Sequence, residues 1–205
     1  MAEETRRGLW EDVAGMRKYL DDRLSGKSIP PPHHSDGRPH DVIMNWLEHN
    51  THPEMKDVYR SLLEEKLASG ATQGLSGLLC IGAELRDEAA RDKVLRWAFP
   101  GNQLSPDFLS IHTAGFTRNY SSIGWHVINL MDATTGNEGF DFYKALISQT
   151  RDAEIALWCL LSLYTRREGR EEEANEAVSS AVNRLKGQYK ELAKLGAKFL
   201  KGQIR

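Results

Sequence analysis

The sequence predicts an all-α protein, on three kinds of observation. Apolar residues recur at helical spacing through most of the chain, and no segment shows the polar–apolar alternation of a half-buried strand. Local signals mark where helices begin and end, such as the cap and proline at Ser105-Pro106 and the stop at Ser69-Gly70. Residues 155–164 are apolar nearly all round, as in a fully buried helix.

Residues 1–39 predict a helical arm on a stiff linker. An apolar face runs along residues 1–24, and Pro30-Pro31-Pro32 then favours an extended polyproline II spacer. Such a face needs burial, so the helix either folds back onto its own chain or docks on a neighbouring copy. In the second case the arm drives oligomerisation, through Leu9, Trp10, Val13, Met16 and Leu20.

Residues 40–100 predict several helices of an N-terminal lobe. The first covers residues 41–47, and Thr51-His52-Pro53-Glu54 then has the pattern of a capping box that opens the next. Ser69-Gly70 stops that helix. Residues 74–85 predict a tightly packed helix despite their glycines, and residues 87–98 predict another.

A turn and a buried helical hairpin are predicted in the middle of the chain. One helix ends near Ala98, Pro100-Gly101-Asn102 is a strong turn signal, and a new helix starts at Pro106. Residues 106–131 are mostly apolar or small, so we expect the rest of the chain to pack on them. Trp125 and Trp158 are expected to be buried in this core.

The C-terminal segment predicts helices with one basic side. Residues 171–205 form helix readily, with interruptions predicted at Gly187, Gly196 and Gly202. Lysines recur there every fourth residue, which places them in one stripe along a helix. The stripe is either the solvated face of a docked helix or a surface for an anionic partner, RNA phosphate or an acidic lipid headgroup. It comprises Lys186, Lys190, Lys194 and Lys198.

Catalytic and metal-binding patterns are weak. The histidines at 33, 34 and 40 lie in or beside the polar linker, and neither cysteine lies near them in a zinc-binding spacing. Cys80 and Cys159 sit in apolar surroundings without a local base, which favours buried, reduced thiols. No stretch predicts a signal peptide or a membrane span. We therefore expect a protein that is not an enzyme and holds no cofactor or metal.

The chain resembles the nucleocapsid proteins of segmented negative-strand RNA viruses of the bunyavirus order. The arm and linker come first, and Val42-Ile43, Asp57 and Ala68-Ser69-Gly70 resemble the N-terminal lobe of that family in spacing. The turn Phe99-Pro100-Gly101-Asn102, followed by Leu109-Ser110-Ile111-His112, resembles the family's central motif. Further matches come from the C-terminal lobe, namely residues 167–172, Ala181-Val182-Asn183 and Lys198-Phe199-Leu200-Lys201.

The resemblance implies a two-lobed helical domain with an N-terminal arm: arm and linker 1–39, N-terminal lobe 40–100, and central helices with C-terminal lobe 101–205. It implies encapsidation of single-stranded RNA in a cleft between the lobes, homo-oligomerisation through the arm, location in the virion and host cytoplasm, and the viral polymerase as a further partner. Basic residues would bind the RNA phosphates, and a base would stack on Tyr120. The basic residues are Arg91, Lys93, Arg96, Arg118, Arg166, Arg167 and Arg170.

Two rival interpretations remain open. Asn45-Trp46-Leu47-Glu48 and residues 129–135 loosely resemble an influenza-type matrix protein, an all-helical viral shell protein that binds anionic membrane and ribonucleoprotein. The third is a non-viral helical adaptor.

Overall fold

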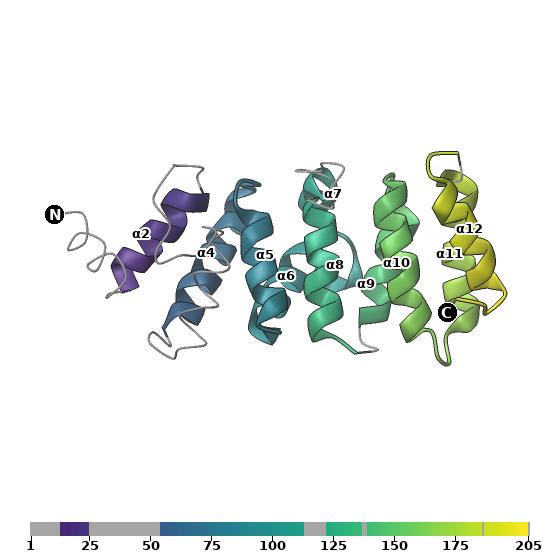
Figure 1. The fold of residues 1–205 in the computed structure, drawn as a ribbon, viewed down its shortest axis with the longest axis horizontal. Helices are drawn as coiled ribbons and strands as arrows, with labels where there is room; N and C mark the ends of the chain where they lie inside the picture. Colours follow the sequence, from purple (N-terminus) through teal and green to yellow (C-terminus); the bar gives the residue numbers. More distant parts are fainter. Residues whose placement is uncertain (1–12, 25–53, 113–121, 137–138, 186, 205) are drawn as a thin grey trace, which may run out of the picture. The chain divides into compact units, whose positions relative to one another are not determined.

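A computed structural model of the chain describes residues 13–24, 54–112, 122–136, 139–185 and 187–204. These residues form helices joined by turns, with no strand among them, which confirms the predicted all-α class (Figure 1). The elements are α2 (Val13–Leu24), α4 (Met55–Ser69), α5 (Leu75–Glu84), α6 (Glu88–Ala98), the 3₁₀ turn η1 (Pro100–Asn102), α7 (Pro106–Ile111), α8 (Ile123–Thr134), α9 (Phe140–Gln149), α10 (Ala153–Arg166), α11 (Glu171–Leu185) and α12 (Lys190–Leu200).

The chain divides into two compact units, residues 1–93 and 94–205. The division falls inside α6, between Lys93 and Val94, whereas the sequence predicted a lobe boundary after residue 100. The reason is local, because the C-terminal end of α6 packs on α7. Trp97 contacts Phe108 edge-to-face, with ring centroids 5.5 Å apart.

The first unit is built on α4, which packs against both α2 and α5. Leu20 of α2 is fully buried, and so are Leu62 and Leu63 of α4. Arg17 of α2 reinforces the contact by donating a hydrogen bond to Ser61 and pairing with Glu65, both on α4. In the described part of the arm, the helix therefore docks on its own chain. The predicted helix over residues 41–47 lies outside the described residues.

Helix ends in this unit follow the predicted local signals only in part. The capping box predicted at the start of α4 was wrong, because Glu54 is itself the N-cap residue and its side chain makes no capping hydrogen bond, while Thr51 lies outside the described residues. Gly70 ends α4 in the left-handed conformation, with φ 66°, and its N–H bonds back to the carbonyl of Leu67. Asp87 accepts hydrogen bonds from the N–H groups of Ala89 and Ala90 and so caps α6. Arg60 of α4 donates two bonds of 2.7 Å to the same carboxylate. This forked pair ties α4 to the start of α6.

The turn and the helix start in the middle of the chain are confirmed. Helix α6 ends at Ala98, and the η1 turn contains Gly101 and Asn102 with φ of 60° and 62°. Ser105 caps α7 by accepting a hydrogen bond of 3.1 Å from the N–H of Phe108, and Pro106 occupies the first helical position.

Helix α10 is the centre of the second unit. It contacts α8 and α9 on one side and α11 and α12 on the other (Figure 1). Its buried face carries Ile155, Cys159 and Leu160. Trp125 and Trp158 are half-buried rather than fully buried, so the expected burial was wrong. They pack edge-to-face on one another with centroids 6.3 Å apart, an arrangement in which part of each side chain stays exposed.

The C-terminal segment forms two helices, and only two of its three predicted interruptions occur. The chain breaks between α11 and α12 around Gly187, and Gly202 ends the second helix with φ 67°. Gly196 instead lies buried inside α12, where a Cβ atom would overlap Cγ2 of Val182 on α11. The prediction that Gly196 interrupts the helix was wrong, because this glycine serves close helix packing.

Candidate nucleic-acid interface

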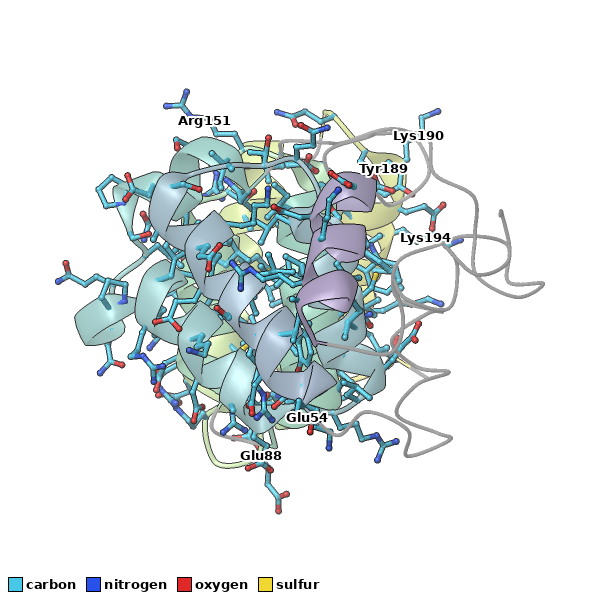
Figure 2. The ribbon with its side chains drawn as sticks, turned by 90° about the vertical axis from the view of Figure 1, so that its left-hand side faces the viewer. Glu54, Glu88, Arg151, Tyr189, Lys190 and Lys194 are labelled. Atoms are coloured by element: carbon cyan, nitrogen blue, oxygen red, sulfur yellow. The ribbon has the colours of Figure 1, made fainter. Side chains whose placement is uncertain are left out.

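Helix α12 has one apolar and one basic face. Leu192, Gly196 and Phe199 are buried against the second unit. Lys190, Lys194 and Lys198 are exposed on the other side, at steps of about 6 Å along the axis. Figure 2 shows the first two projecting outward. The predicted stripe is thus an exposed basic surface, apart from Lys186, which lies outside the described residues.

Few carboxylates neutralise these lysines. Lys194 keeps 65% of its side chain exposed, and it pairs with Glu191 only at 3.9 Å. Such a distant, exposed ion pair does little to neutralise the charge of Lys194. No ion pair within the described residues involves Lys190 or Lys198. We name the three lysines the α12 lysine face and treat it as the least neutralised cluster of positive charge in the described part of the second unit.

A pocket of about 780 Å³ opens beside the N-terminal end of α12. It lies where the end of α7, the α9–α10 junction and the α11–α12 junction meet. Its volume falls in the range typical of ligand pockets, about 300–1,000 Å³. Figure 2 shows Arg151 at the upper left of the view and Tyr189 and Lys190 at the upper right. The lining residues are Leu109, His112, Gln149, Arg151, Asp152, Ala153, Glu154, Gln188 and Tyr189.

The wall of the pocket is held by a chain of hydrogen bonds. The N–H of Asp152 donates to the Thr150 hydroxyl, which lies 3.2 Å from Nε2 of His112. Nδ1 of the same imidazole lies 2.9 Å from the Leu109 carbonyl, which can only accept. The network therefore assigns the proton to Nδ1 and lets Thr150 donate to Nε2. These bonds join the ends of α7, α9 and α10.

Acidic and basic groups line the mouth. Asp152 caps α10, because its Oδ1 accepts from the N–H groups of Glu154 and Ile155 at 2.8 and 3.1 Å. Burial raises the pKa of the Glu154 carboxyl, and the negative charge of Asp152 raises it further. Arg151 is exposed beside them. Asp152 thus acts as a helix-terminal charge at the start of α10.

Arg166, a predicted RNA ligand, is engaged inside the second unit. Its side chain is only 10% exposed and pairs with Asp132 at 3.0 Å. It also donates to the carbonyls of Thr135 and Gly136 at the end of α8. Tyr143 donates to Asp132 as well, at 2.7 Å. This guanidinium is thus largely buried and its N–H groups already have acceptors, so little of it is left for phosphate.

Arg167 and Arg170 are also held by intramolecular contacts. Arg167 lies over the ring of Tyr164 at 4.2 Å and donates to the Phe199 carbonyl, so it fastens α12 to α10. Arg170 pairs with Asp141 at 2.7 Å and with Glu173 at 2.9 Å. Their assignment to RNA stays a prediction, which their geometry does not favour.

The remaining predicted RNA ligands are scattered. On α6, Arg91 pairs with Asp92 at 3.0 Å and Lys93 pairs with Glu64 of α4, whereas Arg96 is exposed. Arg118 and Tyr120 lie outside the described residues. The first unit thus holds two of these cations in ion pairs.

The predicted oligomerisation residues are only partly described. Leu20 is buried within its own chain, and Val13 and Met16 belong to α2, while Leu9 and Trp10 lie outside the described residues. Sequence reasoning missed the pocket, because its lining is brought together from three chain junctions. The isolated polar residues at 149–154 and 188–189 carry no motif that could have revealed it.

The parts of the chain that the structure describes show no metal-binding cluster and no activated cysteine. No group of three or more His, Cys, Asp or Glu residues there is arranged to hold a metal ion. Both cysteines are free thiols, and burial raises the pKa of Cys159. Each helix among the described residues is too short or too polar to cross a bilayer. Comparison of the chain with protein-family models, curated proteins and solved structures gave no match.

Proposed function

We propose that this chain is a nucleocapsid-type protein that binds single-stranded RNA through the α12 lysine face and coats it as a homo-oligomer. The observation that carries the proposal is the exposed, poorly neutralised row of Lys190, Lys194 and Lys198 on a docked helix. The resemblance of the sequence to bunyavirus-order nucleocapsid proteins and the helical fold support the class. On the same ground its place is the virion and the host cytoplasm, with the viral polymerase as a further partner.

The energetics favour the lysine face over the predicted arginines. Exposed ammonium groups release counterions when they meet phosphates and lose few existing contacts. Arg170 would have to leave Asp141 and Glu173, and Arg166 would have to leave Asp132 and the carbonyls of Thr135 and Gly136. Each arginine would thus give up hydrogen bonds that it already makes within the fold, whereas the three lysines give up almost none. The strand therefore follows α12 in this proposal.

The slightly negative net charge of −2 requires the positive charge to be concentrated. Along the C-terminal helices the two signs are separated, because Glu171, Glu172 and Glu173 fill the first turn of α11. The lysines lie on the following helix. An anionic polymer is then attracted to one face and repelled elsewhere.

The test replaces the three lysines together, as K190A/K194A/K198A. Binding of a labelled single-stranded RNA is measured by fluorescence anisotropy at several salt concentrations. The log–log slope should become shallower by about 2, since each lost phosphate contact removes roughly 0.7. The matched control K190R/K194R/K198R keeps the charge and should keep the slope. A triple alanine variant with the wild-type slope and affinity overturns the proposal.

One observation favours the matrix-type alternative. Leu200 is 44% exposed at the end of this amphipathic helix, where an apolar side chain beside lysines suits an anionic membrane surface. Sedimentation with vesicles of phosphatidylcholine, with and without phosphatidylserine, separates the two functions. Binding to the anionic vesicles by a protein that binds no RNA would replace the nucleocapsid proposal with the matrix one.

A further inference from the structure

We infer that the pocket at the start of α12 receives one unstacked nucleobase that carries an amino group, with guanine as the best match. The inference rests on the proposed function, because the base would belong to the strand held by the α12 lysine face. It goes beyond that function by assigning a base preference to a protein whose lysines read only phosphate charge.

Position makes the pocket part of the same surface. Gln188 and Tyr189 line it and directly precede Lys190, the first residue of α12. Arg151, on the opposite junction, lines the same pocket, and Figure 2 shows it at the upper left of the view, with Tyr189 and Lys190 at the upper right. A strand that passes along the lysines thus reaches the pocket mouth with its next nucleotide. The volume of about 780 Å³ exceeds what one base fills, leaving space for its sugar.

The pocket contains polar groups that the fold does not use. Within the described residues, the side chains of Gln149, Arg151, Glu154 and Gln188 make no hydrogen bond or ion pair. This contrasts with Arg166, Arg167 and Arg170, whose guanidinium groups all bind partners in their own unit. Donors and acceptors from two chain junctions, α9–α10 and α11–α12, therefore meet at one opening without satisfying each other.

The charged side chains that line the pocket determine which base fits it best. A carboxylate at Glu154 accepts from a pair of N–H donors, and the Watson–Crick edge of guanine presents two, at N1 and the amino group. The guanidinium of Arg151 has the fork that matches O6 and N7 of the same base. Burial and the neighbouring negative charge of Asp152 raise the pKa of Glu154. An N–H donor bound to this carboxylate would offset both effects.

Other bases fit less well. Cytosine and adenine keep an amino donor for Glu154, but neither presents guanine's combination of two adjacent donors with two acceptors. Uracil keeps a single N–H donor, at N3, with a carbonyl oxygen on either side, so the second oxygen of the carboxylate would face an acceptor. The expected order is guanine first and uracil last, with about 10- to 100-fold between them, as for one bidentate contact.

The experiment uses the full chain and two probes. The first is a uridine octamer with or without a single central guanosine, measured by anisotropy. The second is free guanosine or uridine monophosphate, measured by calorimetry. Wild type should prefer the guanosine-containing probe of each pair by about tenfold or more. E154Q and R151A should abolish most of this preference while keeping the salt-dependent affinity for the uridine octamer.

The control is E176Q, which changes an exposed carboxylate on α11 outside this pocket. It should leave the preference unchanged, and circular dichroism melts check that all variants fold. Equal affinity of wild type for the paired probes, or a preference that survives E154Q and R151A, overturns the inference. If the monophosphate preference holds but no octamer binds, only the nucleocapsid proposal fails. If octamers bind without preference, only the pocket assignment fails.

Discussion

Gly196 is the residue at which α11 and α12 come closest. A Cβ atom there would overlap Cγ2 of Val182, and a valine in a helix has little freedom to turn away. We predict that G196A lowers the free energy of unfolding by about 1–3 kcal/mol, although alanine is the better helix former. Urea denaturation followed by circular dichroism measures the change.

Two further variants isolate the cause. G187A is the matched control, because a Cβ atom at Gly187 meets nothing within 4 Å. It should change stability by less than about 0.5 kcal/mol. V182A removes the atom that G196A overlaps, so the double variant should recover part of the loss. Strict additivity of the two single effects would contradict the steric explanation.

Leu20 tests whether the arm belongs to its own chain. The structure buries this side chain fully, between α2 and α4, and Arg17 adds contacts to Ser61 and Glu65. L20A should therefore cost about 2–5 kcal/mol. Because the contact is within one chain, the drop in melting temperature should be the same at all protein concentrations. A loss that grows on dilution would show that α2 docks on a neighbouring copy, as the oligomerisation hypothesis predicts.

At the scale of elements, α9 and α11 are joined by a network of exposed and half-buried charges. Arg170 and Lys144 both pair with Glu173, and each also lies near Asp141. The hydrogen bonds from Arg170 and Lys144 lower the pKa of Glu173 from 4.5 to about 2. The folded state therefore binds a proton at this carboxylate less readily than the unfolded state.

The sign of the pH dependence is set by that shift. The network contributes its full stability above about pH 4.5 and loses it as the pH falls towards 2. We predict that the melting temperature of wild type exceeds that of E173Q at pH 6. The difference should shrink between pH 4.5 and 2, and high salt should reduce it. A difference that stays constant down to pH 2 would show that the ionisation of Glu173 does not contribute to it.

The sequence predicted the ends of helices better than it predicted which distant residues contact each other. Ser105 and Gly70 act through neighbours a few residues away, so their caps could be predicted from local pattern. Gly196 follows the same stop pattern, yet its role depends on Val182 of another helix. Arg166 looked available for RNA, because Asp132, its partner, lies 34 residues earlier in the chain. The pocket joins three junctions for the same long-range reason.

At the scale of the whole molecule, the two units have separate buried cores. Tyr59, Leu62 and Leu63 belong to the first, and Phe140 and Leu160 to the second. A domain of roughly 100 residues buries enough surface to fold alone. We predict that a fragment of residues 87–205, which keeps Asp87 as the cap of α6, unfolds cooperatively in urea. Its slope should be about 1–3 kcal/mol per M.

The same fragment decides between two locations for RNA. A site on α12 and its pocket lies entirely within residues 94–205, so the fragment should bind the uridine octamer about as tightly as the full chain. A cleft between two lobes, which the family resemblance implies, would need residues of the first unit as well. Anisotropy on both proteins at one salt concentration makes the comparison. A folded fragment that has lost most of the affinity would move RNA from the α12 lysine face to a surface that includes residues before Asp87, which the fragment lacks.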